Sequence, residues 1–352
     1  MSSLEWVKPQ YSKGAVDRAA RQLLVGDATT PEYWQAMNTV NNWRASHNFP
    51  LNTFQVTLRK KALAIDPHRL VAQRIKRMTS IEAKLARFPA MRMSQMQDIG
   101  GCRVILNTVK NVEMLAETYE ESDLKHKLDD IDDYIANPKS SGYRGIHLVY
   151  RYFSDREGPS IYNGLFVEMQ LRTKLQHTWA TAVETVGTFL SQALKSSLGE
   201  EQWLRFFSLM GSAFAIKEKC ASLVPDTPQD AGRLAKEIRD IEKVLNVQNA
   251  LSMYQHAIEV TQEGDQQNHH YFLLVLEPGK GTMIFKGFPR SKLEEASHAY
   301  LIQEERIADS PGAEAVLVSV DSIQNLKRAY PNYFLDTTSF LNELGSILNK
   351  GL

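Results

Sequence analysis

Two acidic residues, Asp98 and Glu168, stand in apolar, strand-like parts of this chain that are far apart in sequence. Asp98 comes just before two glycines and the apolar run Cys102–Leu106, and Glu168 lies within Leu165–Leu171. A carboxylate is costly to bury among apolar side chains unless partners hold it, and glycines beside it leave room for a ligand. The pattern predicts a site where magnesium holds a nucleotide triphosphate, since phosphoryl-type transfer depends on positioning and charge neutralisation.

Each of these residues also has an ordinary interpretation. An aspartate before glycine often only closes a turn. Glu168, Gln170 and Arg172 alternate along one segment and so share a face, which is typical of a solvated strand as well as of a polar site. Both interpretations stay open on these residues alone.

The overall charge is balanced, with 41 basic and 41 acidic residues, so no net field draws the chain toward nucleic acid or membrane. Basic residues nevertheless cluster between Arg59 and Arg103, where a polyanion can dock. A length of 352 residues with 43% hydrophobic content favours two domains.

The cysteine content and the apolar runs bear on location. Only Cys102 and Cys220 occur, which argues against a disulfide framework or a zinc cage and favours a reducing compartment. The first residues lack an apolar signal core, and no run approaches the roughly 20 apolar residues that a membrane helix needs. We expect a cytoplasmic protein with no membrane partner.

The first two thirds of the chain predict an α/β (α+β) catalytic domain, a mixed sheet flanked by helices. The first 90 residues read as helical, and a proline after Thr30 marks one helix start. Strands follow, with further helices to cover them. The expected helices are Tyr33–Ser46, Phe54–Ile65, Ser80–Phe88, Asn111–Glu121 and Lys174–Leu194, and the expected strands are Cys102–Leu106, Ile146–Phe153 and Leu165–Leu171.

The remainder predicts a connecting helix and a small regulatory α+β module. After a helix over Gln202–Leu223, apolar residues recur at helical spacing within 226–264, interrupted at Gln248, which gives a helix of about 50 Å if unbroken. The module has a hairpin, a helix, a strand and a terminal helix. We therefore divide the chain into a catalytic domain at 1–225, a long connecting helix at 226–264 and a regulatory domain at 265–352. The module's elements are Tyr271–Leu276, Thr282–Phe288, Ser291–Ile307, Ala315–Val320 and Thr337–Leu348.

Two further groups of side chains suit nucleotide chemistry. Lys76, Ser80 and Lys84 recur every four residues, so a helix would align them as phosphate ligands or as a solvated charged face. The loop from Lys139 to His147 offers a cation, an imidazole and the ring of Tyr143, which suits base stacking but also an ordinary turn. The next helix carries His177 and Trp179, which we interpret as packing residues.

Four motifs in this order and spacing resemble the synthetase domain of the RelA/SpoT family. They are R-x-K-x-x-x-S-x-x-x-K from Arg74, D-x-x-G-x-R from Asp98, DYIxxPKxxGYxxxH from Asp133 and E-x-Q-x-R-T-x-x-x-H-x-W from Glu168. The likeness covers roughly residues 40 to 190. It implies transfer of the β,γ-pyrophosphate of ATP to a 3′-hydroxyl, with Mg²⁺ as cofactor.

The resemblance implies a role for each matching residue. Arg74 and Arg103 would enclose the adenine, and Asp98 with Glu168 would bind the metal. Glu168 would also take the proton of the attacking hydroxyl. ATP phosphates would be held by Lys76, Ser80 and Lys84, and the acceptor by Tyr143 through stacking, with Lys139, His147, Gln170 and Arg172 positioning its phosphates or the loop.

The sequence departs from the family pattern before the tyrosine loop and after Trp179. Asp130–Asp133 is acidic where many bifunctional members are basic, which resembles monofunctional synthetases and leaves the acceptor open. Val183-Glu184 replaces the usual acidic-histidine pair. No hydrolase motif is seen.

A narrower likeness is to CapRel-type fused toxin–antitoxins of phage defence, carried by NNWRASHNFPLNTF near residue 41 and by AYPNYF near the end. It implies that Tyr330 and Tyr333 are autoinhibitory and occupy the adenine pocket, unless they merely pack the module. It also implies a phage capsid protein as trigger and the 3′ CCA end of tRNA as acceptor. The tRNA backbone would meet the basic residues Arg59 to Lys61, Arg69, Arg77 and Arg87.

Three functions are therefore weighed. The first is a toxin that modifies tRNA, blocks translation and is silenced by its own C-terminal part. The second is a standalone (p)ppGpp alarmone synthetase that uses GDP or GTP. The third is a non-catalytic nucleotide-sensing module, against which the presence of both Asp98 and Glu168 argues.

Overall fold

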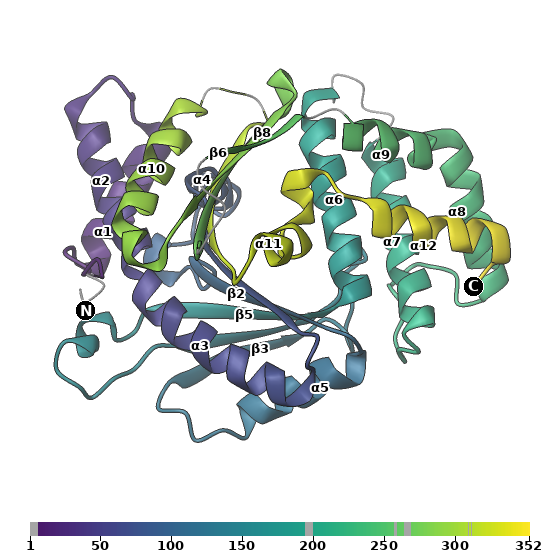
Figure 1. Ribbon diagram of the computed structural model, residues 1–352, viewed down its shortest axis with the longest axis horizontal. Coiled ribbons are helices and arrows are strands. Elements are labelled where there is room, and N and C mark those ends of the chain that lie inside the picture. Colours follow the sequence, from purple (N-terminus) through teal and green to yellow (C-terminus); the bar gives the residue numbers. More distant parts are fainter. Residues whose placement is uncertain (1–5, 194–199, 257–258, 264–268, 309, 311) are drawn as a thin grey trace.

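The two parts of the chain share one sheet. The computed structural model describes residues 6–193, 200–256, 259–263, 269–308, 310 and 312–352. Nine strands form a single sheet in the order β3-β4-β5-β2-β1-β9-β7-β8-β6, with helices on its faces (Figure 1). The fold class expected from the sequence, a mixed sheet flanked by helices with a smaller α+β part at the C-terminal end, is confirmed.

The first five strands belong to the half that carries the motifs. Strands β2 and β5 run parallel, and the other neighbours in this half are antiparallel. The parallel pair brings the residues after Asp98 beside Glu168. The strands are β1 (Leu70–Ile75), β2 (Gly100–Leu106), β3 (Lys127–Asp133), β4 (Ile146–Arg151) and β5 (Phe166–Thr173).

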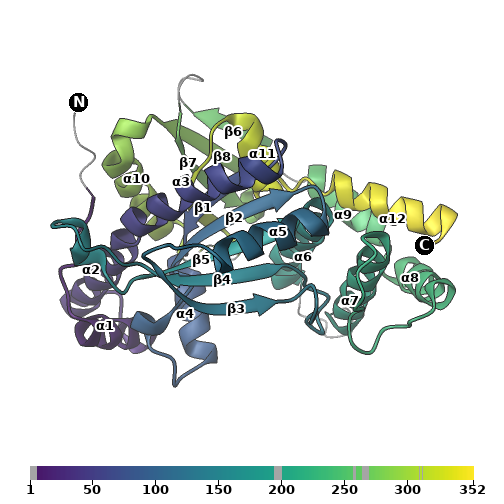
Figure 2. The ribbon, with the colours of Figure 1, turned by 90° about the horizontal axis from the view of Figure 1, so that it is seen from below.

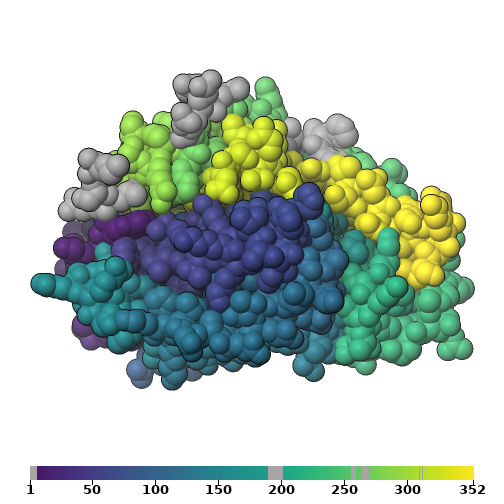
Figure 3. Space-filling model, turned by 60° about the horizontal axis from the view of Figure 1, so that its bottom comes forward, coloured from purple at the N-terminus to yellow at the C-terminus, as the bar shows by residue number. Residues whose placement is uncertain are grey.

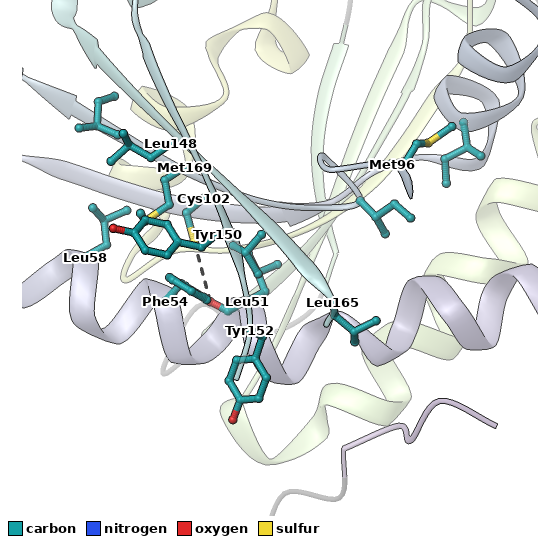
Figure 4. Close-up of a cluster of buried hydrophobic side chains, with 14 of the residues drawn as sticks. Leu51, Phe54, Leu58, Met96, Cys102, Leu148, Tyr150, Tyr152, Leu165 and Met169 are labelled. Atoms are coloured by element: carbon teal, nitrogen blue, oxygen red, sulfur yellow. Dashed lines mark hydrogen bonds between the residues drawn. The ribbon is translucent and has the colours of Figure 1, made fainter. Parts of the chain in front are cut away.

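Helix α3 packs its apolar stripe onto one face of this sheet. Leu51, Phe54 and Leu58 recur every three or four residues and lie against Cys102 and Tyr150 of the strands (Figure 4). The Sγ atom of Cys102 lies 3.8 Å from the Leu51 carbonyl oxygen (Figure 4), so the thiol is an inert core residue, and burial raises its pKa. The helices of this half are α1 (Lys13–Val25), α2 (Pro31–Ser46), α3 (Asn48–Ile65), α4 (Met78–Arg87), α5 (Val109–Glu120) and α6 (Lys174–Ala193).

The start of α2 shows why the sequence signals work locally. The Thr30 side chain accepts a hydrogen bond from the Tyr33 backbone N–H, and Pro31 takes the first helical position, where no N–H partner is needed. The predicted cap and helix are thus confirmed.

The C-terminal half has a helical cluster and a strand-rich layer. Helices α7, α8, α9 and α12 pack with α6, while β7, β8 and β9 extend the sheet under α10 (Figures 1 and 2). On the face shown in Figure 3 the green and yellow C-terminal surfaces abut the blue surfaces of the first half along a long seam. The elements are α7 (Glu200–Lys217), α8 (Ala231–Leu245), α9 (Val247–His256), β6 (Glu259–Glu263), β7 (Tyr271–Glu277), β8 (Thr282–Phe288), α10 (Leu293–Arg306), β9 (Glu314–Ser319), α11 (Ile323–Ala329), the short 3-10 turn η5 (Pro331–Phe334) and α12 (Thr338–Lys350).

Three expectations need correction. The long helix within 226–264 is broken, because Asn246 adopts a left-handed conformation with φ 51° and separates α8 from α9. Strand β1 was missed in the supposedly helical first 90 residues. Lys76 follows that strand and precedes α4, so it does not share a helical face with Ser80 and Lys84. Residues 194, 257, 258 and 264, which belonged to predicted helices, lie outside the described part.

No helix in the described part of the chain is long and apolar enough to cross a bilayer.

Replacing Phe54 with alanine should lower the free energy of unfolding by about 3 to 5 kcal/mol, because it deletes a ring that packs against Tyr150 in the sheet core. Val56 lies on the same helix but is exposed, so Val56→Ala should change stability by no more than about 0.5 kcal/mol. Urea unfolding followed by circular dichroism measures both, and equal midpoints for the two variants would contradict this packing.

Candidate active site

The two carboxylates predicted to converge line one cavity: Asp98 lies in the turn just before β2, and Glu168 lies on the neighbouring strand β5. Gly101, three residues after Asp98, pairs with Glu168 across the parallel strands β2 and β5. Three cations of the same half and one tyrosine of the C-terminal half complete the cavity. Its lining is Arg74, Lys76, Asp98, Gly101, Cys102, Arg103, Glu168, Gln170 and Tyr330.

Asp98 is held by two lysines. Lys76 Nζ lies 2.7 Å from Asp98 Oδ2, and Lys84 Nζ lies 3.0 Å from Asp98 Oδ1. Lys76 comes from the end of β1 and Lys84 from α4, so the carboxylate joins two elements. Ser80 lies on the first turn of α4, between these lysines in sequence. The resemblance implies that these lysines hold ATP phosphates, and in this structure both hold Asp98.

Glu168 is a partly buried carboxylate held in its ionised form. Burial by itself would raise the pKa of Glu168, but the hydrogen bond from His147, 2.9 Å away, and the bond from Gln170, 2.8 Å away, outweigh it and lower that pKa to about 2. Arg172 in turn donates to Gln170 at 3.0 Å, which makes the polar row of β5 a connected network. An ionised carboxylate suits a metal ligand, whereas a proton acceptor with such a low pKa is weak near neutral pH.

The donor set fits magnesium in its usual protein environment. Among the described residues no group of three or more His, Cys, Asp and Glu side chains gathers at one place. Mg²⁺ commonly takes one or two carboxylates and fills its remaining positions with water and substrate phosphates. Asp98 and Glu168 would hold it, and the ion would neutralise charge that develops on the transferred phosphates.

The tyrosine loop is packed around a network rather than free. Tyr143 Oη is 2.5 Å from His147 Nε2 and accepts a hydrogen bond from Arg172 Nε at 3.1 Å. The guanidinium of Arg172 lies 4.9 Å and the Nζ of Lys139 5.5 Å from the centre of the Tyr143 ring. Gly142 has φ 99°, and a Cβ there would meet the Phe207 carbonyl oxygen at 2.5 Å, so only glycine fits this turn. All the acceptor residues suggested by the resemblance are therefore in one place.

The helix after β5 carries two residues interpreted as packing. Trp179 is buried and donates to the Phe207 carbonyl at 2.8 Å. His177 is buried, and its Nε2 lies 3.1 Å from the Arg328 carbonyl oxygen. Both are structural, as the sequence indicated.

Tyr330 and Tyr333 are buried against the nucleotide side of this site. The Arg103 guanidinium lies 5.7 Å from the centre of the Tyr330 ring, and Arg103 also donates to the Ala329 carbonyl at 3.3 Å. Tyr333 is 0% exposed, and the positive charges of Arg77 and Arg74 act on its hydroxyl. The two rings meet edge to face with centres 6.4 Å apart. The C-terminal half thus covers the arginines that the resemblance assigns to adenine.

The remaining space is too small for a nucleotide. The cavity has a volume of about 40 Å³, room for a few water molecules only. Pockets for small-molecule ligands usually measure about 300 to 1,000 Å³. The structure is therefore a closed form of the site.

A second contact between the halves was missed from the sequence. Glu304 of α10 accepts hydrogen bonds from the Met78 backbone N–H at 2.7 Å, from the Tyr300 hydroxyl at 2.6 Å and from Arg44 at 3.0 and 3.2 Å. Arg44 is 2% exposed. Met78 is the first residue of α4, so a carboxylate of the C-terminal half sits at the positive end of the helix that carries Ser80 and Lys84. No pattern distinguishes Glu304 from the other glutamates of α10, so sequence reasoning had no signal for it.

Residues 73–187 match the model of a region found in RelA/SpoT proteins. Among curated relatives, the GTP pyrophosphokinase YjbM of Bacillus subtilis (strain 168) is 35% identical over 118 residues, which is 33% of this chain and 54% of that protein. A GTP pyrophosphokinase of Escherichia coli (strain K12) is 45% identical over 53 residues, 15% of this chain and 6% of its own length. The chain thus contains a region found in RelA/SpoT proteins, and it spans only about half of the first relative and a small part of the second.

Solved structures with some likeness include two synthetases. The small alarmone synthetase 1 of B. subtilis bound to its product pppGpp shows 24% identity and a TM-score of 0.42, covering 49% of this chain and 89% of that one. A GTP pyrophosphokinase family protein of Streptococcus pneumoniae shows 21% identity and a TM-score of 0.41, covering 54% and 91%.

The low pKa of Glu168 predicts a loss of stability in acid. Its carboxylate is ionised in the folded chain down to about pH 2 but protonates near 4.5 when unfolded, so its contribution is present above about pH 4.5 and is lost as pH falls toward 2. Between pH 5 and pH 3 wild type should lose about 2 kcal/mol more than Glu168→Gln. Urea midpoints at the two pH values measure this, and the exposed Glu113→Gln should behave like wild type. Parallel losses in wild type and Glu168→Gln would show that the carboxylate is not held as described.

Proposed function

We propose that this chain is a pyrophosphokinase that transfers the β,γ-pyrophosphate of ATP to a 3′-hydroxyl. The acceptor oxygen bonds to the β-phosphorus, the bond between that phosphorus and the oxygen bridging to the α-phosphate breaks, and AMP leaves. The acceptor's proton passes to a base, a role that the resemblance gives to Glu168, although its pKa of about 2 in the closed form makes this carboxylate a weak proton acceptor. The observation that carries the proposal is the convergence of Asp98, Glu168 and the lysine–arginine set in one cavity.

Guanosine nucleotides are the first candidate acceptor. The relatives that match the synthetase region are named GTP pyrophosphokinases. Tyr143, ringed by Arg172 and Lys139, is where the acceptor's base and phosphates would be held. The product would be a (p)ppGpp alarmone.

The tRNA 3′ end is the second candidate, and the placement of the tyrosine pair favours it. Tyr330 lines the cavity beside Arg103, and Tyr333 is buried next to it, which supports the adenine-blocking role that the resemblance to fused toxin–antitoxins implies. Two of the basic residues suggested for the tRNA backbone are also engaged, Arg59 by Asp321 at 2.9 Å and Arg77 by Glu314. A C-terminal part that covers both the ATP cavity and the basic residues would silence a toxin until a phage capsid protein moved it.

The proposed division of labour follows the predicted domains. Residues 1–225 would act as the synthetase and residues 265–352 as the regulator, with 226–264 between them. Residue 264 and its neighbours to 268 lie outside the described part. The purely nucleotide-sensing alternative has less support, because both carboxylates and their cationic partners are in place.

An acceptor-competition assay decides between the two acceptors. Protein with Tyr330→Ala and Tyr333→Ala, incubated with ATP labelled in the γ-phosphate, GDP, GTP and deacylated tRNA, should label either the guanosine nucleotides or the tRNA. Adding Asp98→Asn should reduce labelling by about 10² or more, because it removes a metal ligand and the partner of two lysines. Labelling that survives Asp98→Asn would refute the proposed chemistry.

Removing the tyrosine rings should open the ATP cavity. Wild type should bind a non-hydrolysable ATP analogue weakly, and the double alanine variant should bind it at least about tenfold more tightly, because the closed form leaves too little room. Tyr330→Phe with Tyr333→Phe is the matched control, since it keeps both rings and should stay closed. Calorimetry measures the affinities, and the same affinity in wild type and the alanine variant would mean that the tyrosines do not block ATP.

A further inference from the structure

A second hollow lies where α6, α11 and α12 meet, apart from the active-site cavity. It has a volume of about 250 Å³ and shares no lining residue with that cavity. Figure 1 shows α11 beside α6, with α12 leading away across the helical cluster. We call it the seam pocket, because Lys174 and His177 come from the synthetase half and Arg328 and Thr337 from the C-terminal half.

We propose that the seam pocket binds a small phosphate-bearing anion, of about the size of pyrophosphate.

The charge of the lining favours an anion. Lys174, Lys327 and Arg328 line the pocket with exposed side chains, against one acid, Asp336. Asp336 accepts a hydrogen bond from the Thr338 N–H at 3.1 Å, just before α12 begins. The lining keeps an excess of positive charge, which attracts phosphate most strongly at low ionic strength.

Two helices begin at the pocket. Lys174 is the first residue of the 20-residue helix α6, and Thr338 that of the 13-residue helix α12. First-turn N–H groups carry partial positive charge and here stand beside the three cations. The Thr338 N–H is already bonded to Asp336 and the Gln176 N–H to Thr173, so these helix ends add to the positive field rather than donate freely.

The wall also contains polar atoms whose hydrogen bonding is incomplete. Thr181 Oγ1 and Thr337 Oγ1 are buried and have no partner within the protein. Buried hydroxyls nearly always have one, so these two need an acceptor. Both residues line the pocket, so a phosphate oxygen would supply it once these side chains turned toward the ligand.

The size of the hollow limits the ligand. A volume of 250 Å³ is below that of most pockets for drug-sized molecules, about 300 to 1,000 Å³, yet far above that of a single water molecule. A phosphate, a pyrophosphate or a compact monophosphate fits this range, whereas a long polyanion would contact only the rim.

The place of the pocket gives the ligand a consequence. Pro331, which lines it, lies between Tyr330 and Tyr333, and Arg328 precedes Tyr330 by two residues. An anion held between Lys174 and Arg328 would tie the tyrosine segment to α6 and stabilise the closed form. Binding itself does not depend on the proposed transfer activity, whereas this regulatory consequence does.

The test is calorimetric titration of the full chain with pyrophosphate, in an Asp98→Asn background so that no turnover contributes. The protein should bind, and Lys174→Ala with Arg328→Ala should weaken binding by about tenfold or more, because two charge-assisted contacts are lost. Lys243→Ala with Lys350→Ala removes the same charge at exposed positions elsewhere and should leave the affinity unchanged.

Inorganic phosphate and AMP are titrated in parallel to find which phosphate source the pocket takes. Absence of binding by all three anions would overturn the proposal, as would equal affinities in the two double variants. Anion binding to the Asp98→Asn protein would support the seam-pocket proposal whatever the transfer assay shows. The seam-pocket proposal and the proposed function can therefore be refuted independently.

Discussion

Strand β1 is the constraint on which the closed arrangement depends. It pairs with β2 along its whole length and, on its other edge, with β9 through Gln73 and Arg74. Since β9 leads directly into α11 and the turn after it, this pairing fixes where the tyrosine segment lies. A strand that carries a proposed ATP ligand therefore also anchors the part of the chain that covers the site.

The closed form satisfies the charges of an empty site with the protein's own groups. Lys76 and Lys84 share Asp98, while the C-terminal half supplies Glu304 to Arg44 and Glu314 to Arg77. The Tyr330 ring lies beside Arg103, where in the proposed function it takes the place of adenine. If these cations receive a polyphosphate, as proposed, they would repel one another when left alone. The contacts with the protein's own groups then let the site stay folded without ATP.

The sequence predicted the fold and the convergence of the site better than it predicted the contacts between the halves. Apolar periodicity placed α2, α3, β2 and β5 because each buries a continuous face. The same reasoning missed β1, whose end runs into a basic stretch that resembles a solvated helix face. It also extended one helix through Asn246, although asparagine, after glycine, is the residue that most often takes the left-handed conformation at a helix end.

Contacts between residues that are far apart in sequence could not be predicted from local sequence patterns. Glu304 and Arg44 are separated by most of the chain. Arg44 stands in the segment NNWRASHNFPLNTF, but nothing in the sequence links that segment to Glu304, so only the folded structure brings the two together. Asp98 and Glu168 are also far apart in sequence. Their unusual setting among apolar side chains nevertheless identified both as candidate site residues. Residues that break a local rule were visible from the sequence, whereas residues that obey it while serving the interface were not.

The small volume left in the closed cavity has an energetic consequence for the protein: the closed form must be stable enough to resist opening by ATP. If ATP binds only an open form, as proposed, ATP itself pulls the chain open by mass action: at a nucleotide concentration about 100 times its intrinsic Kd, that pull is about 2.7 kcal/mol. The tyrosine and glutamate contacts together must outweigh it by a wide margin for the chain to stay silent. A chain that stays inactive where ATP is abundant must therefore have a minimum free energy of closure, supplied by the contacts between its two halves.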